Sequence, residues 1–136
     1  MKEIFKSGAI KTFEVLVKPE DTASFESGNV HPVYATFALG RDAEWCCRLF
    51  VLDMKEADEE GIGTFLNIEH ISPALVGSSV IFKAMLKSIT GNNIICSYEA
   101  QVGGRMIAKG ETGQKIMKKE KFEKLFREIK GITNDE

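Results

Sequence analysis

The fold of this chain is decided by residues 36–57, which read TFALGRDAEWCCRLFVLDMKEA. This stretch contains no proline and a single glycine, Gly40, so it predicts a long helix. Its first part is apolar on nearly every side, and a helix of that kind is normally buried by elements packed around it. We expect Thr36 to be the N-cap and Gly61 to mark the end. The stretch therefore predicts a central helix that the rest of the chain covers.

Outside this helix the apolar period drops to two, which is typical of strands. We expect strands at residues 11–17, 62–71, 78–90, 94–102 and 105–117. Residues 20–29 are polar and predict a loop. Apolar residues at i, i+3, i+4 and i+7 then predict a closing amphipathic helix: Phe122, Leu125, Phe126 and Ile129.

The expected order is one strand, a long helix, four strands in an antiparallel meander and a surface helix. A curved antiparallel sheet wrapped around one central helix satisfies this order, which is the α+β hotdog fold, with residues 1–136 as one domain. Such a sheet has open edges and covers its helix only partly. We therefore expect a homodimer, and leave open whether dimers pair into tetramers.

Length and composition restrict the class of protein. The chain has 136 residues, 43% of them hydrophobic, which excludes a disordered chain. Its net charge of −2 gives no general attraction to nucleic acid. No apolar run is long enough to cross a membrane and the charged N-terminus is no signal peptide, so we expect a cytoplasmic location. The chain has only three cysteines and two histidines, which makes a disulfide framework or a structural metal site an unfavoured interpretation.

Three polar residues stand where the pattern predicts apolar or crowded surroundings: Thr36, Glu44 and His70. Each has an ordinary structural interpretation. Thr36 can cap the helix, Glu44 can be a surface residue or pair with Arg41 or Arg48, and His70 can be a hydrogen-bonded structural residue. Together the three residues suggest a catalytic site. A hydroxyl at a helix N-terminus, a carboxylate two turns on and an imidazole from a nearby strand can cleave an acyl bond, because free N–H groups at the helix start stabilise an oxyanion.

Other chemically interesting residues have a weaker case. His31 precedes a proline in the predicted loop, and Cys46 and Cys47 fit core packing. Either core packing or a pocket wall explains three aromatic residues: Trp45, Phe50 and Phe65.

The run Val33-Tyr34-Ala35-Thr36, followed by Glu44, by Gly63-Thr64 and by His70 before the turn PALVG, resembles the hotdog thioesterases of the fluoroacetyl-CoA thioesterase family. The resemblance extends from about residue 10 to residue 118. It implies hydrolysis of an acyl-CoA thioester at a dimer-interface pocket, with no cofactor. By the same resemblance Thr36, Glu44 and His70 are catalytic, and Gly63 and Thr64 bind substrate. Whether water or an enzyme residue attacks the carbonyl stays open.

Basic residues gather near the C-terminus, where residues 115–130 contain seven basic and three acidic side chains. The resemblance implies that a basic residue near Lys115 takes the place of a family arginine. Lys115, Lys118 and Lys119 are expected to meet CoA phosphates, whereas a solvated helix face is the favoured interpretation of Lys121, Lys124 and Lys130. Residues 37–41 are bulkier and more charged than expected for an enzyme selective for fluoroacetyl-CoA, so the acyl group is not specified.

Two alternative functions use the same fold. One is an acyl-CoA-binding module without turnover. The other is a hydratase or dehydratase acting on acyl thioesters, in which His31 would be the catalytic histidine, although no carboxylate stands at the usual spacing from it.

Overall fold

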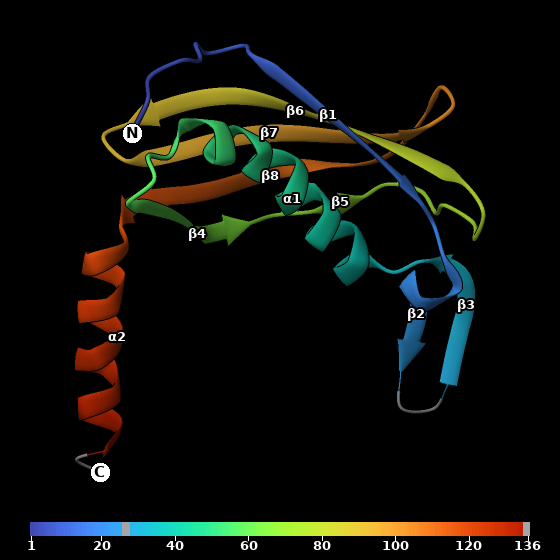
Figure 1. Ribbon diagram of the computed structural model, residues 1–136. Helices are drawn as coiled ribbons and strands as arrows, with labels where there is room; N and C mark the ends of the chain where they lie inside the picture. Colours follow the sequence, from blue (N-terminus) through green and yellow to red (C-terminus); the bar gives the residue numbers. More distant parts are fainter. Residues whose placement is uncertain (26–27, 135–136) are drawn as a thin grey trace.

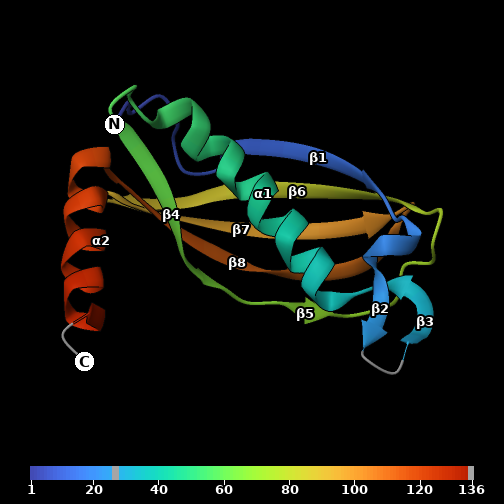
Figure 2. The same cartoon turned by 60° about the horizontal axis from the view of Figure 1, so that its bottom comes forward.

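The computed structural model describes residues 1–25 and 28–134. Its elements are, in chain order, β1 (Ile10–Leu16), the short 3-10 helix η1 (Pro19–Asp21), β2 (Thr22–Phe25), β3 (Gly28–Tyr34), α1 (Thr36–Met54), β4 (Glu59–Leu66), β5 (Glu69–His70), β6 (Ser79–Thr90), β7 (Asn93–Val102), β8 (Arg105–Lys118) and α2 (Lys119–Asn134). An antiparallel sheet in the order β1-β6-β7-β8-β4 curls around α1, and the short β5 pairs with β8 beyond β4 (Figures 1 and 2). This arrangement confirms the predicted hotdog fold.

The strand order corrects one prediction. We expected four strands after the helix to form a meander, but β4 pairs with β8 and not with β6, so only β6, β7 and β8 are consecutive neighbours. The predicted strand 62–71 is also divided into β4 and β5. The chain then returns to the other side of the sheet past the start of α1, where Val33 bridges Leu75 and the Tyr34 N–H donates to the Ala74 carbonyl at 2.8 Å. Alternating apolar residues predict that a strand exists. Which strand it pairs with depends on the path of the segment between β5 and β6.

The predicted polar loop at 20–29 was wrong. Part of it forms η1, β2 and β3, and β2 and β3 make a small two-stranded sheet of their own beside the start of α1 (Figure 1). His31 is in strand β3 and not in a loop, while its side chain lies outside the described residues. The pairing has two register shifts and β2 is short and polar, which removes the regular alternation that identifies a strand.

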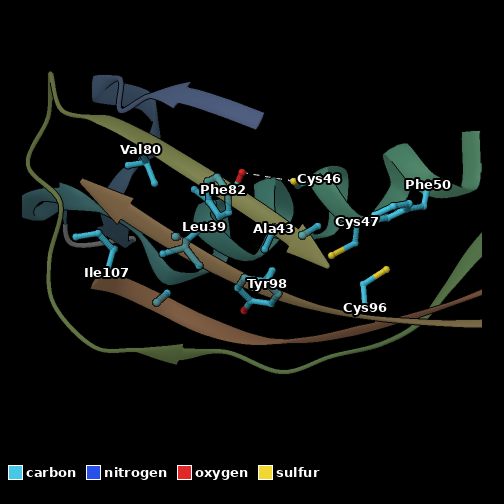
Figure 3. Packing of buried hydrophobic residues seen from close by; sticks show 14 of the residues in the cluster. Leu39, Ala43, Cys46, Cys47, Phe50, Val80, Phe82, Cys96, Tyr98 and Ile107 are labelled. Atoms are coloured by element: carbon cyan, nitrogen blue, oxygen red, sulfur yellow. Dashed lines mark hydrogen bonds between the residues drawn. The ribbon is translucent and has the colours of Figure 1, made fainter. Parts of the chain in front are cut away.

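Helix α1 packs its apolar side chains against the concave face of the sheet, where Leu39 and Ala43 lie near Phe82 and Tyr98 (Figure 3). The other side of α1 is covered less than the sequence predicted. Three large apolar residues along it are exposed: Phe37 (66%), Trp45 (42%) and Leu52 (38%). One sheet can surround a helix only in part, so the apolar character on all sides exceeds what a single copy buries.

The ends of the helices differ from expectation in detail. The N-cap of α1 is Ala35, and Thr36 is the first helical residue, while the C-cap is Lys55, well before Gly61. Helix α2 is amphipathic as predicted and extends away from the sheet (Figure 1), burying Phe122 while Leu125 and Phe126 stay exposed. No helix in the described part of the chain is long and apolar enough to cross a membrane.

Candidate active site

Thr36 and His70 are in contact although 34 residues separate them. The Thr36 hydroxyl Oγ1 lies 2.9 Å from the His70 ring nitrogen Nδ1. Thr36 is held there as the first residue of α1, and His70 by its pairing with Ala108 of β8. Just after it, the Ile71 N–H donates to the Ile107 carbonyl at 2.7 Å. The fold therefore brings a hydroxyl and an imidazole together at the N-terminus of the central helix.

The other nitrogen of His70 is enclosed. Nε2 is buried and has no hydrogen-bond partner among the described residues. Burial lowers the pKa of His70, and a hydrogen bond with the backbone of Ser72 opposes this shift only in part. Because the ordinary value is already near 6.5 and the shift is downward, the imidazole is neutral at neutral pH, with Nδ1 toward Thr36.

Glu44 is in the middle of α1 and half-buried. Its carboxylate oxygen Oε1 lies 2.6 Å from the position that a β-carbon on Gly63 would occupy, so the glutamate uses space that the glycine leaves open. Neither expected ion pair forms. Arg48 donates to the Gly61 carbonyl at 3.0 Å and to Glu60 at 3.2 Å, and Arg41 pairs with two aspartates. The structural interpretation of Glu44 as a salt-bridge residue is therefore wrong.

Glu44 is on the same helix as Thr36, and among the described residues it makes no hydrogen bond or ion pair with Thr36 or His70. Eight residues of helix separate Glu44 from Thr36, about 12 Å along the axis, and helical side chains lean toward the N-terminus, which shortens that gap. Thr64 follows Gly63 at a bulge in β4, where it is exposed. A single copy thus places the carboxylate and the hydroxyl–imidazole pair along one side of α1.

The three lysines predicted to bind substrate lie elsewhere. Lys118 is paired with Glu59 of β4, whereas His70 is opposite Ala108, so the two positions are separated by ten residues of β8, about 33 Å. Lys118 also forms an ion pair with Asp58 at 2.7 Å, which raises the pKa of the lysine. Lys115 and Lys119 share this end of the sheet. One copy of the chain does not bring them to Thr36 and His70.

The aromatic residues and cysteines are now placed. Phe50 is fully buried core, while Trp45 and Phe65 are exposed at 42% each. All three cysteines are free and buried, as core packing predicted: Cys46, Cys47 and Cys96. Burial raises the pKa of Cys46 to about 12, which makes it a poor nucleophile.

A buried polar network fixes the start of α1 and was not expected from the sequence. The Tyr34 hydroxyl donates to Asp42, one turn and a half into the helix, and Arg41 donates to both Asp42 and Asp21 at 3.1 Å. The Asp21 carbonyl in turn accepts from the N–H of Ala35 at 2.8 Å. Residues on both sides therefore anchor the backbone that carries Thr36. The signal in the sequence was an aspartate within an otherwise apolar stretch.

A second missed residue is Gln114, which is 2% exposed on the inner face of β8. Neither atom of its side-chain amide has a hydrogen-bond partner among the described residues. Period-two reading of β8 places Thr112, Gln114 and Ile116 on one face, so a polar residue in an inward row was visible beforehand.

Comparison with known proteins identifies the family and supports the fold. The sequence matches the fluoroacetyl-CoA-specific thioesterase family over residues 17–120. A Thermus thermophilus protein of the thioesterase superfamily is similar in structure, with 37% identity, a TM-score of 0.92 and coverage of 98% of this chain and 99% of that chain. A mutant of the fluoroacetyl-CoA-specific thioesterase FlK in complex with fluoroacetate and CoA is 25% identical, with a TM-score of 0.80 and coverage of 87% and 99%. A hot-dog-like protein from Thermanaerovibrio acidaminovorans, at 18% identity, shares the fold with a TM-score of 0.85 and covers 93% of each chain. No curated protein sequence gives a significant match.

Proposed function

Because this chain belongs to the fluoroacetyl-CoA-specific thioesterase family, we propose that it hydrolyses an acyl-CoA thioester to a carboxylic acid and free CoA. The observation that carries the proposal is the 2.9 Å contact between Thr36 and His70 at the N-terminus of α1, with Glu44 further along the same helix. The similarity to an FlK structure that contains CoA supports acyl-CoA as the substrate class.

The start of α1 receives the thioester carbonyl in this proposal. The first intrahelical hydrogen bond is from the Leu39 N–H to the Ala35 carbonyl, so the N–H groups of residues 36–38 have no acceptor within the helix. Such groups stabilise the negative charge that develops on the carbonyl oxygen during attack. Thr36 stands beside them, and its hydroxyl helps to hold the carbonyl.

Glu44 carries out the attack step, either by taking a proton from water as the water oxygen bonds to the carbonyl carbon, or by bonding to that carbon itself. The carbon–sulfur bond then breaks and CoA leaves as a thiolate. Where Glu44 has bonded to the carbon, water afterwards hydrolyses the acyl–glutamyl anhydride, which releases the carboxylic acid and restores Glu44. His70, in contact with Thr36, stabilises the departing thiolate. No step in this sequence requires a metal or a redox cofactor.

A homodimer would complete the site. Strand β4 is at the edge of the sheet, and it exposes Ile62 and Phe65 at 41% and 42%. An unpaired apolar edge favours pairing with a second copy. If two β4 edges pair antiparallel, the ends of the sheet exchange places, so that the lysine-bearing end of one copy lies beside the Thr36 end of the other. This arrangement would let Lys115, Lys118 and Lys119 meet CoA phosphates across the interface. We place this enzyme in the cytoplasm.

Release of free thiol tests the function directly. Purified protein is mixed with short, medium and long acyl-CoAs, and thiol is followed with a chromogenic reagent. We expect release by the wild type, and a loss of orders of magnitude in Glu44→Gln and His70→Asn, whereas Glu99→Gln, an exposed glutamate on β7, retains the wild-type rate. Tight binding of acyl-CoA without thiol release would contradict the proposal and indicate a binding module.

A further inference from the structure

Gln114 is buried in a way that calls for a ligand. Its side chain is 2% exposed, and both its amide nitrogen and its amide oxygen lack a hydrogen-bond partner among the described residues. Buried polar groups are almost always hydrogen-bonded, and each unpaired one destabilises the folded state. A side chain with a donor and an acceptor both unpaired is therefore suited to a bound group that supplies the two missing partners.

The position of Gln114 connects it to Glu44. Gln114 is the register partner of Gly63, and side chains of partners in an antiparallel pair point to the same face, with β-carbons about 5 Å apart. The Glu44 carboxylate occupies the space where a Gly63 side chain would be. The unpaired amide and the carboxylate are consequently neighbours on the inner face of the sheet, with Gln114 buried and Glu44 half-buried.

We propose that Gln114 determines specificity, by selecting a short acyl group that carries a neutral hydroxyl near the thioester. This inference rests on the proposed thioesterase function and names its substrate class. An acyl group that reaches Glu44 for attack comes within reach of the amide behind it. A hydroxyl both donates and accepts, so it pairs with both atoms of the amide.

Other acyl groups fit less well. A plain alkyl group leaves the amide unpaired, and a site with unpaired polar groups discriminates strongly against such an analogue. A carboxylate accepts but does not donate, and it would bring a second negative charge to Glu44. Ile94 and Ile116 flank Gln114 on the inner face, and their side chains are only 1% and 2% exposed. A long acyl chain therefore has no space to extend in this direction.

The kinetic test compares hydroxyacetyl-CoA with acetyl-CoA and lactoyl-CoA with propionyl-CoA. We expect the wild type to prefer the hydroxylated member of each pair by about tenfold or more in kcat/KM. Gln114→Met keeps the length of the side chain and removes the amide, so the ratio of kcat/KM between the hydroxylated and the plain substrate should fall toward one. The chain has only one other glutamine, Gln101, and Gln101→Met is the matched control that keeps the preference. A wild-type ratio near one, or a ratio that survives in Gln114→Met, would overturn the assignment.

A second measurement needs neither turnover nor a variant that folds. With glutamine labelled by ¹⁵N, the wild type gives two side-chain amide signals. Non-hydrolysable thioether analogues of hydroxyacetyl-CoA and acetyl-CoA are then added. We expect the Gln114 amide to shift with the hydroxylated analogue only. Equal shifts, or none although both analogues bind, would mean that water satisfies Gln114 and that it selects nothing. A selective shift without thiol release would refute the hydrolysis and retain the binding preference.

Discussion

Replacing Gly63 with alanine should impair catalysis while leaving the protein folded. The new β-carbon would be 2.6 Å from Oε1 of Glu44, whereas ordinary contacts begin at 3.4 Å, so the carboxylate must retreat by about 0.8 Å. The group that moves is the end of a flexible side chain, and the free energy of unfolding should change by less than about 1 kcal/mol. A displacement of about 1 Å in a catalytic group can reduce the rate roughly a hundredfold.

The assay pairs thiol release with urea denaturation. Gly104→Ala is the control, because no atom lies within 4 Å of the β-carbon that it adds and its φ is not in the left-handed region. We expect kcat to fall about a hundredfold in Gly63→Ala and to stay unchanged in Gly104→Ala, with both proteins equally stable. A Gly63→Ala enzyme with wild-type kcat would refute the reasoning, since it would show that the position of Glu44 against β4 does not matter for turnover.

Three further predictions concern buried groups. Tyr34→Phe removes the donor to Asp42 and should lower the free energy of unfolding by about 1–3 kcal/mol in urea, and unchanged stability would mean that Arg41 alone satisfies the aspartate. Because burial lowers the pKa of His70, the unfolded chain binds more protons than the folded one below about pH 6.5, so stability should decrease as the pH falls through that range. His70→Asn should remove this slope in denaturation curves, and a persisting slope would assign it to another group. Cys46, with its pKa raised to about 12, should resist alkylation at about pH 8 until the protein unfolds, which mass spectrometry can follow; rapid labelling of the native protein would contradict its burial.

The part of the fold that the sequence predicts is the part with regular periodicity. Strands β6 and β7 alternate buried and more exposed residues over eight positions each, and the structure places the ends of β6, β7 and β8 within a residue or two of expectation. Helix α1 is equally clear, since it lacks proline and is apolar. The β2–β3 hairpin and the partner of β4 were not predictable in this way, because a polar strand with register shifts has no clear period and pairing is decided by a connection that passes the start of α1.

The candidate site divides along similar lines. Thr36 and His70 were selected for their residue types at the ends of predicted elements, and the structure brings them into contact. Glu44 was ambiguous because an isolated carboxylate in an apolar helix fits an ion pair equally well, and only the structure shows that the arginines have other partners. The inward position of Gln114 follows from the alternation in β8, but its proximity to Gly63 and Glu44 depends on the register between β4 and β8, which no single-strand pattern contains.

The order in which strands pair has a consequence for synthesis on the ribosome. Strands β4 and β5, which carry Gly63 and His70, take their sheet neighbour from β8, the last strand of the chain. After His70 has been made, 48 further residues must follow before β8 ends at Lys118. At about 5–20 residues per second, roughly 2–10 s pass in which His70 exists without the strand that holds it against Thr36. The nascent chain therefore carries its apolar helix long before it can assemble the site, and chaperones have that interval in which to bind it.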